Sequence, residues 1–274
     1  MALPAPVPGV PVAVTGASSG IGEALAGELA ARGHDVLLVA RREERLRALA
    51  ERLRLLHGVT AEVRAADLAA PADRDAVAAE LAERDLAGLC NNAGIGSYGA
   101  YLDADPEHVA GMIAVNAVAL NALTAAVLPG MVRRGAGGVL NVASILGHGP
   151  QPLNAAYAAT KAFAIALSEA VHAELAGTGV SVSVLSPGPV RTDIYGPSSA
   201  ETLEDIGPSF IWQEPEAVAR AGVELMERGG RTAVPGLFNA LAATGSRFLP
   251  RTVSLPVQRA VGAALPELRR RLPF

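Results

Sequence analysis

The segment that most constrains the fold lies near the start of the chain, at Val10–Arg32. It begins with a mostly β-branched run, Val10–Thr15, which is typical of a strand buried on both faces. A turn reading Gly16-Ala17-Ser18-Ser19-Gly20-Ile21-Gly22 follows, and an amphipathic helical pattern comes next. This order lets a backbone approach a pyrophosphate closely, and the helix N-terminus stabilises the negative charge. A tight structural turn would use the same glycines, so the pattern alone is compatible with both interpretations.

The rest of the chain repeats the alternation of buried strand and amphipathic helix. Such alternation predicts an α/β fold, with a doubly wound (Rossmann-type) seven-stranded parallel sheet and helices on both faces. The expected strands cover residues 10–15, 35–40, 59–65, 86–90, 139–143, 180–185 and 231–234. We expect residues 1–234 to form a single domain, with a flap at 188–214. Residues 235–274 are expected to form a C-terminal helical extension packed on the same domain.

The end of the second expected strand carries two arginines. The strand ends at Ala40, and Arg41 and Arg42 follow directly. In a dinucleotide-binding sheet this position meets the adenosine ribose, where an acid bonds the 2′-hydroxyl and an arginine accommodates a 2′-phosphate. The sequence therefore favours NADP(H) over NAD(H). Alternatively, both arginines belong to a solvated helix start that also contains Glu43 and Glu44.

Polar residues follow two further strands. Asp67 and Leu68 come after the third strand, and the turn Asn91–Gly94, which includes Asn92 and Ala93, comes after the fourth. Ligands of doubly wound sheets bind outside the carboxyl ends of the strands, so these residues are expected to contact a cofactor. Asparagines in a turn are equally common as plain turn formers.

Three side chains with complementary chemistry follow the fifth strand. Ser144 ends the strand, and Tyr157 and Lys161 lie four residues apart on an expected helix, hence on one face. An ammonium group beside a phenol favours the phenolate and lowers the phenol pKa, and a hydroxyl group can hold an oxyanion. Lys161 is the only lysine in the chain, and the other 22 basic residues counted with it are arginines. An ordinary helix carrying a tyrosine and a lysine would show the same spacing.

Asn116 interrupts an apolar helical pattern that begins at Asp105-Pro106. Asparagine is a poor residue for a helix interior, because its side chain competes for backbone hydrogen bonds. Asn116 is therefore expected either to cap a break between two helices or to hold another group through its side chain. Within the same pattern, Met112 and Ile113 are expected to face inward.

Composition excludes several classes of protein. The formal net charge of −4 gives no support to a nucleic-acid partner. Cys90 is the only cysteine, lies in an apolar strand pattern, and has no Cys/His cluster around it, so we expect a buried residue and no metal site. The N-terminus lacks the pattern of a secretory signal, and no apolar run is expected to be long and unbroken enough to span a bilayer. A cytoplasmic protein is the expectation.

Two C-terminal regions lack a motif. Within the flap, the apolar residues Ile194, Tyr195, Phe210 and Trp212 are expected either to line a substrate pocket or to fold back onto the core. The tail contains one acid, Glu267, and arginines at 247, 251, 259, 269, 270 and 271. A basic amphipathic tail can bind a membrane surface. Because prolines interrupt it, packing on the substrate side or on a neighbouring subunit is the favoured interpretation.

Four marks occur in order on this frame, and together they resemble the short-chain dehydrogenase/reductase family, in its NADP-preferring branch. They are T-G-x-x-x-G-I-G at 15–22, N-N-A-G at 91–94, Ser144 with Y-x-x-x-K at 157–161, and P-G at 187–188. Each mark is weak by itself, whereas the ordered set is highly specific. The resemblance covers about Val10 to Thr192, so the tail has no counterpart in the minimal pattern.

The resemblance implies roles for individual residues. Tyr157 would be the general acid/base, Lys161 would bond the nicotinamide ribose, and Ser144 would hold the substrate oxygen. Asn116 matches the family's helix-kink asparagine, which holds a water that links Lys161 to solvent. With the positional arguments above, the expected dinucleotide contacts are Gly16, Ser18, Ser19, Gly20, Ile21, Gly22, Arg41, Arg42, Asp67, Leu68, Asn92, Ala93, Gly94, Tyr157, Lys161, Pro187, Gly188, Val190 and Thr192.

The resemblance also implies an activity: hydride transfer between NADP(H) and a ketone or secondary alcohol, which we expect to be lipophilic. Family members are usually homodimers or homotetramers built on the two long helices, here about 106–134 and 154–177. Two alternatives stay open at this stage. One is a dinucleotide-binding sensor without catalysis, and the other is a membrane-surface protein that works through its basic tail.

Overall fold

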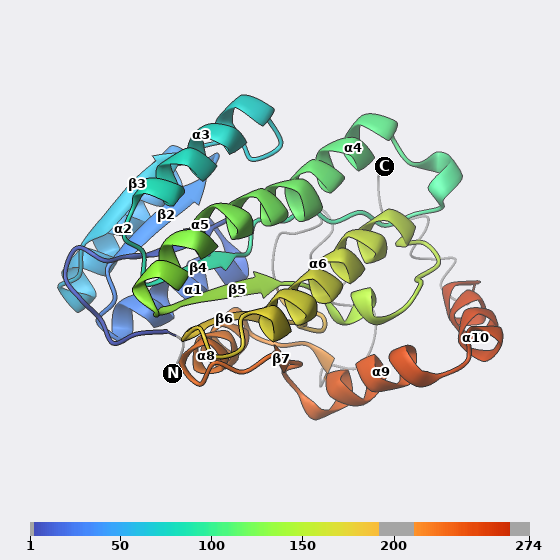
Figure 1. Ribbon diagram of the computed structural model, residues 1–274. Helices are drawn as coiled ribbons and strands as arrows, with labels where there is room; N and C mark the ends of the chain where they lie inside the picture. Colours follow the sequence, from blue (N-terminus) through green and yellow to red (C-terminus); the bar gives the residue numbers. More distant parts are fainter. Residues whose placement is uncertain (1–2, 192–210, 264–274) are drawn as a thin grey trace.

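The computed structural model describes residues 3–191 and 211–263, and its centre is one parallel sheet (Figure 1). The strand order is β3-β2-β1-β4-β5-β6-β7, and all pairs are parallel. The strands are β1 (Val12–Thr15), β2 (Val36–Ala40), β3 (Ala61–Ala65), β4 (Gly88–Asn91), β5 (Gly137–Val142), β6 (Val180–Leu185) and β7 (Thr232–Ala233). The predicted seven-stranded, Rossmann-type α/β fold is therefore confirmed, with strand bounds shifted by a few residues.

Helices cover both faces of the sheet. The first face carries α1 (Gly20–Ala31), α2 (Glu43–His57) and α8 (Pro215–Glu227). The second carries α3 (Pro71–Glu83), α4 (Pro106–Ile113), the π-helical segment η2 (Ala114–Ala119), α5 (Leu120–Arg134) and α6 (Ala155–Glu174). The short 3₁₀ segments are η1 (Tyr101–Asp103) and η3 (Ile145–His148), and the C-terminal helices are α9 (Leu237–Phe248) and α10 (Arg251–Ala263).

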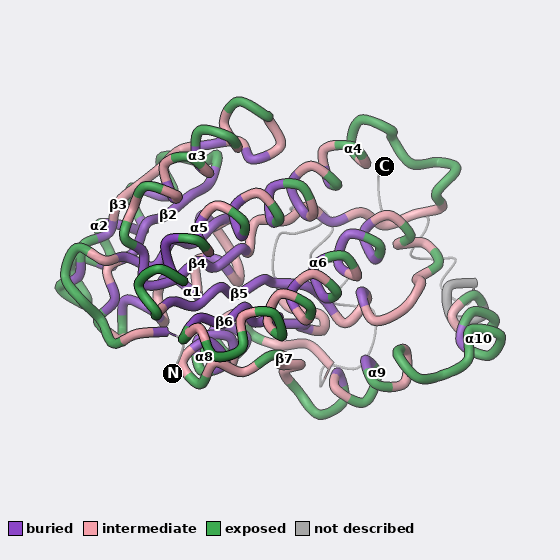
Figure 2. The backbone as a smooth tube through the Cα atoms, viewed as in Figure 1, coloured by how far each residue is buried: buried purple, intermediate pink, exposed green. Residues whose placement is uncertain are grey.

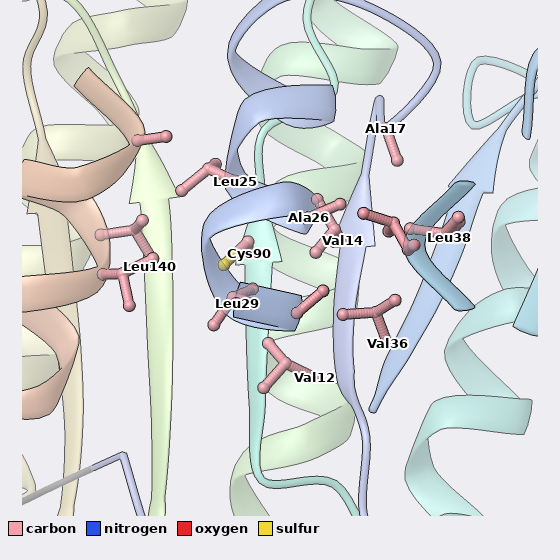
Figure 3. Close-up of a cluster of buried hydrophobic side chains, with 14 of the residues drawn as sticks. Val12, Val14, Ala17, Leu25, Ala26, Leu29, Val36, Leu38, Cys90 and Leu140 are labelled. Atoms are coloured by element: carbon pink, nitrogen blue, oxygen red, sulfur yellow. The ribbon is translucent and has the colours of Figure 1, made fainter. Parts of the chain in front are cut away.

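The core consists of two hydrophobic layers that the sheet separates. Side chains alternate between the faces of a strand, and in β1 Val12 and Val14 join the layer under α1, whereas Ala13 joins the layer under α5. Figure 3 shows Leu25, Ala26 and Leu29 of α1 packed over the first layer. Because both faces are covered, the inner strands read as continuous apolar runs, and they form the buried centre of the tube in Figure 2.

Cys90 lies in β4 and is fully buried, as expected from its apolar surroundings. Its sulfur lies 3.6 Å from the sulfur of Met226 on α8. Burial raises the pKa of the thiol to about 12. The thiol is therefore protonated near neutral pH and belongs to the core packing.

The helix from Pro106 to Arg134 is continuous, since α4 passes into α5 through η2. By length and composition alone this helix could cross a membrane, so the expectation that no run is long enough for a bilayer was wrong on that criterion. Its inner face packs on α3, β4 and β5, as expected of a helix that covers a sheet. Met112 faces inward as predicted, whereas Ile113 is 43% exposed and the prediction for that residue was wrong.

Candidate active site

The glycine-rich turn between β1 and α1 is packed against the turn after β4. Gly16 has a φ of +66°, which favours glycine, and a Cβ there would lie 2.8 Å from the Cα of Ala93. A Cβ at Gly22 would lie 2.3 Å from the carbonyl oxygen of Gly16. Both glycines therefore allow close backbone contact, and Gly20, with a φ of +57°, opens the helix.

Hydrogen bonds hold the same two turns together. The hydroxyl oxygen of Thr15 accepts from the backbone N–H groups of Asn92 and Ala93, both at 3.0 Å. The Asn92 amide donates back to the carbonyl oxygens of Thr15 (3.1 Å) and Gly16 (3.4 Å). Asn92 thus fixes the cradle through its side chain. The role of Thr15 was not predicted, although its position at the end of a buried strand next to Gly16 was the available signal.

Asn91, in contrast, is part of the core. It is the last residue of β4, and its amide donates to Thr124 and Asn141, both at 3.0 Å. Asn141 in turn donates to Ser168 of α6 at 2.9 Å. The turn expected at Asn91–Gly94 therefore begins one residue later, and the Asn91 side chain belongs to a buried network that joins β4 and β5 to the helices above them.

Arg42 lies over the glycine-rich turn. Its guanidinium donates to the hydroxyl groups of Ser18 (2.9 Å) and Ser19 (2.7 Å). Arg41 is exposed beside it, at the carboxyl end of β2. The structure therefore brings the two predicted arginines and the two predicted serines to one place. Ile21, also predicted, packs against the first core layer.

Asp67 and Leu68 follow β3. One Asp67 carboxylate oxygen accepts from the backbone N–H of Ala69 at 3.0 Å, and the Asp67 N–H donates to Asp73 at 2.8 Å. The Leu68 side chain is buried in the second core layer. The structure thus places Asp67 in a local turn at the sheet's carboxyl edge, with the Leu68 side chain directed into the core.

Ser144 begins the segment that follows β5. It is the N-cap of η3, and its hydroxyl accepts from the backbone N–H of Leu146 at 3.2 Å. Ile145 directly follows Ser144, and its backbone N–H donates to the carbonyl oxygen of Pro187 at 3.0 Å. Hence Ser144 and the predicted Pro187–Gly188 turn lie side by side at the ends of neighbouring strands. Val190 packs against the first core layer, and Thr192 lies outside the described residues.

Tyr157 and Lys161 lie on one face of α6, as predicted, and both are buried. The Lys161 nitrogen is 5.7 Å from the centre of the Tyr157 ring and donates to the carbonyl oxygen of Val142 at 2.9 Å. Burial lowers the pKa of Lys161 from its ordinary 10.5 to about 8. The ammonium form therefore predominates at neutral pH next to the phenol.

Asn116 lies inside η2 and is almost fully buried. Its carbonyl oxygen accepts from the Ile95 N–H, and its amide donates to the Ile95 carbonyl oxygen, both at 2.9 Å. The amide also contacts the Thr160 hydroxyl at 3.2 Å, which itself donates to the carbonyl oxygen of Tyr157 at 2.7 Å. Asn116 therefore holds the segment after β4 in place, and the helix does not break at this residue. Thr160 was missed, although it directly precedes Lys161.

Gly94 connects the two halves of the site. A Cβ at Gly94 would lie 3.5 Å from both the Asn116 side-chain oxygen and the Lys161 nitrogen. The backbone after Ala93 therefore passes directly in front of the catalytic candidates. Asn116, Tyr157 and Lys161 lie in one region of the carboxyl edge of the sheet, and Ser144 lies just after the end of β5.

The substrate side includes residues that the sequence analysis did not single out. A Cβ at Gly188 would meet the side chain of Asn239 at 2.3 Å, and one at Gly149 would meet Ser246 at 2.5 Å. Both partners belong to α9, which packs on η3. Of the residues proposed as pocket walls, only Trp212 lies within the described part of the chain, and Ile194, Tyr195 and Phe210 do not.

A groove of about 620 Å³ opens between α1, α2 and α8. Ser19, Gly20 and Arg191 line its edge nearest the glycine-rich turn. None of the four catalytic candidates lines it. Its mixed charges belong to helix surfaces, so we assign the chemistry to the carboxyl edge of the sheet.

A dinucleotide fits these residues. The Ser19 side chain, at the N-cap of α1, makes no capping hydrogen bond, so the first turn of the helix keeps N–H donors for an anion. Gly16 and Gly22 keep the backbone bare where a Cβ would intrude. Arg42, Ser18 and Ser19 form a group of donors at the ribose end of the cradle.

Comparison with known proteins agrees with this geometry. A family model described as short chain dehydrogenase matches residues 11–202. The very-long-chain 3-oxoacyl-CoA reductase of Anas platyrhynchos is 36% identical over 215 residues, which cover 77% of this chain and 66% of that protein. The 7beta-hydroxysteroid dehydrogenase of Collinsella aerofaciens is 35% identical, with 65% and 68% covered. The chain thus matches about two thirds of the length of these relatives.

A solved structure with the same fold is a short-chain dehydrogenase from Sphingobium yanoikuyae in complex with NADPH. It has a TM-score of 0.77 and 36% identity, with 86% of this chain and 93% of that chain covered. The bulky-bulky ketone specific alcohol dehydrogenase from Comamonas testosteroni has a TM-score of 0.74 and 29% identity, with 93% and 94% covered. The chain belongs to the short-chain dehydrogenase/reductase family of oxidoreductases, whose nicotinamide dinucleotide site its residues fit.

Proposed function

We propose that this protein transfers a hydride between NADP(H) and a lipophilic ketone or secondary alcohol. The observation that carries the proposal is the meeting of Lys161 and Asn116 at the backbone of Gly94, with Tyr157 beside Lys161 and Ser144 in the segment after β5. The dinucleotide, when bound, supplies or accepts the hydride. Gly16, Gly22, Asn92, Gly94 and Gly188 would hold it against the carboxyl edge of the sheet.

The chain's own residues perform the proton chemistry. Tyr157 gives its phenolic proton to the carbonyl oxygen during reduction and takes the hydroxyl proton during oxidation. The ammonium group of Lys161 lies 5.7 Å from the centre of the Tyr157 ring and stabilises the phenolate that reduction leaves on Tyr157. Ser144 donates to the substrate oxygen where negative charge develops. Asn116 positions the segment that separates these groups from the glycine-rich turn.

The preference for NADP(H) rests on Arg42 and Arg41. Arg42 follows β2 and donates hydrogen bonds to the hydroxyl groups of Ser18 and Ser19. A 2′-phosphate bound there would replace or join these contacts. Arg41 is exposed at the same edge. Several structural relatives carry this form of the cofactor, including the Sphingobium enzyme with NADPH and a Thermococcus sibiricus alcohol dehydrogenase with 5-hydroxy-NADP.

The names of relatives support a lipophilic substrate, and exposed apolar side chains support an oligomer. Relatives are named for very-long-chain acyl, steroid and bulky ketone substrates, all of which are large and mainly apolar. Exposed apolar side chains also lie on the long helices of the second face, namely Ile113, Val118, Val132 and Phe163. A homodimer or homotetramer would cover them.

Substitution of Tyr157 by phenylalanine tests the chemistry. Tyr157→Phe removes only the phenolic oxygen, so turnover should fall about 100-fold or more while the affinity for NADPH stays unchanged. Turnover is measured with a panel of ketones, and affinity by fluorescence titration. Tyr101→Phe is the matched control, since Tyr101 is 65% exposed in η1. Normal turnover in Tyr157→Phe would overturn the proposal, whereas NADPH binding without any turnover in the native protein would favour the sensor.

Substitution of Arg42 by leucine tests the cofactor preference. Loss of charge-assisted hydrogen bonds to a phosphate should weaken NADPH binding about tenfold and leave NADH binding unchanged. Arg41→Leu should act in the same direction. Arg47→Leu, on the exposed side of α2, is the control. Equal effects on both dinucleotides would contradict NADP(H) specificity.

A further inference from the structure

The helix α9 presents its large apolar side chains outward. Leu241 is 64% exposed and Phe248 is 76% exposed, and their spacing of seven puts them on one face together with Leu237. The face toward the body of the protein instead carries Asn239 and Ala243, which are 2% and 3% exposed. A surface helix normally buries its apolar face, so this helix has the reverse orientation.

Exposed apolar side chains also occur beyond α9. Leu249, which links the two helices, and Val253 and Leu255 of α10 are all exposed. The two helices follow each other in the chain at one end of the molecule (Figure 1), and much of their surface is exposed in Figure 2. We call Leu237, Leu241, Phe248 and Leu249 the tail face; Val253 and Leu255, two residues apart, lie on different sides of α10.

The segment that contains α9 and α10 carries charged side chains of a single sign. Between Glu227 and Glu267 the sequence contains no aspartate or glutamate, but it has arginines at 228, 231, 247, 251 and 259. Arg251 and Arg259 are exposed on α10. Glu169 of α6 pairs with Arg247 and Arg231, whereas Arg251 and Arg259 lie in a segment that contains no acid. Apolar side chains next to such arginines match the boundary between anionic headgroups and acyl chains.

We propose that the tail face docks onto an anionic lipid surface. A second copy of the chain fits less well, because a two-fold interface brings the same patch of each copy together and would place arginines against arginines. The body of the protein holds the face in a fixed orientation. Arg247 pairs with Glu169 of α6 (3.4 Å), and Asn239 donates to Gln213 and to the Pro235 carbonyl oxygen, both at 3.2 Å.

Docking in this orientation would bring the membrane close to the site. The inner side of α9 packs on η3, the segment that begins directly after Ser144. A lipophilic substrate could then pass from the bilayer to the carboxyl edge of the sheet without crossing water. This last consequence rests on the proposed function, whereas the docking itself depends only on the exposed residues and their charge.

Co-sedimentation of the full-length protein with vesicles tests the proposal. We expect binding to vesicles of phosphatidylcholine with phosphatidylglycerol and much weaker binding to phosphatidylcholine alone. The double variant Leu241→Ser/Phe248→Ser should lose binding about tenfold or more, since it removes apolar side chains that enter the interface. Arg251→Gln/Arg259→Gln should weaken it about fivefold per arginine, and added salt should have the same effect.

Two exposed leucines at a distance provide the matched control. Leu55 and Leu56 lie on α2, far from α9 (Figure 1), and are 76% and 68% exposed. Leu55→Ser/Leu56→Ser should leave vesicle binding unchanged. Absence of binding by the native protein, or equal losses in the α2 and α9 variants, would overturn the proposal. So would a shift of the α9 variant to a smaller oligomer in gel filtration, because the face would then join two copies. Binding is measured without cofactor or substrate, so its outcome is separate from that of the catalytic tests.

Discussion

The cofactor side and the tail side of this molecule are built differently. Around the glycine-rich turn, polar groups satisfy one another: Thr15 accepts from two N–H groups, and Asn92 donates to two carbonyl oxygens. On the tail side, side-chain polar atoms of His148, Asn239 and Ser246 are buried without a partner among the described residues. The tail helices also expose large apolar side chains.

This difference reflects what each side must recognise. A dinucleotide has one shape, so its cradle is fixed by backbone contacts and closed hydrogen bonds that leave little room for change. A substrate pocket differs among relatives with different substrates, and buried polar atoms without partners are groups that a ligand or water can satisfy. We therefore expect substitutions on the cofactor side to lower stability and ligand affinity more than comparable substitutions on the tail side.

The largest effect is expected for Gly22→Ala. The added Cβ would lie 2.3 Å from the backbone oxygen of Gly16, so the turn must move and both the fold and the cofactor site should suffer. We expect a loss of about 3 kcal/mol in the free energy of unfolding and at least a tenfold loss of NADPH affinity. Urea denaturation and fluorescence titration measure the two effects.

Gly27→Ala, on the same helix, is the matched control. A Cβ at Gly27 meets nothing within 4 Å, so this variant should gain about 0.5–1 kcal/mol from the better helix propensity of alanine. If both variants were equally stable and bound NADPH equally well, the cradle would not be as tightly fixed as its geometry indicates.

The sheet was predictable because burial on both faces leaves a direct trace in the sequence. Strands β1, β2 and β6 read as apolar or alternating β-branched runs, and glycines mark the turns that follow β1 and β6. The neighbourhood of Tyr157 and Lys161 followed from helical spacing alone. Asn116 drew attention as a polar residue in an apolar stretch, but its pairing with Ile95 depends on how two distant segments meet.

Other features could not be predicted, because tertiary context decides them. Ile113 fits an inward helical position, yet η2 changes the helical period next to it and the side chain is exposed. Leucine and phenylalanine on α9 would be assigned to the core by any pattern rule, whereas the structure buries Asn239 and Ala243 there. Pro256 was expected to interrupt the tail, but it lies inside α10.

A second effect concerns Lys161, where burial lowers the pKa from 10.5 to about 8. Below pH 8 the group is charged in both the folded and the unfolded state, and the folded state bears the cost of desolvation. Between pH 8 and 10.5 the unfolded state binds more protons, so the contribution of Lys161 to stability must rise with pH. The rise should reach about 3 kcal/mol at most, at 1.36 kcal/mol per pKa unit.

Lys161→Met removes this titration while keeping the length of the side chain. The difference in unfolding free energy between the native protein and the variant should therefore change across pH 8–10.5, when both are measured without cofactor by urea denaturation. A constant difference over this range would mean that the ammonium group is not desolvated, and hence that the site is more open to water than its geometry indicates.

The smallest effect is expected for the ion pair between α9 and α6. Arg247 and Glu169 are both partly exposed, so their pairing should contribute about 0.2–1 kcal/mol. A double-mutant cycle with Arg247→Gln and Glu169→Gln isolates this coupling from the other contacts of Glu169, such as that with Arg231. Because α9 packs on η3, the same variants should change the KM for substrate more than the affinity for NADPH. An equal change in both would mean that the two sides are mechanically coupled, and the contrast between a fixed cradle and an adaptable substrate side would then be wrong.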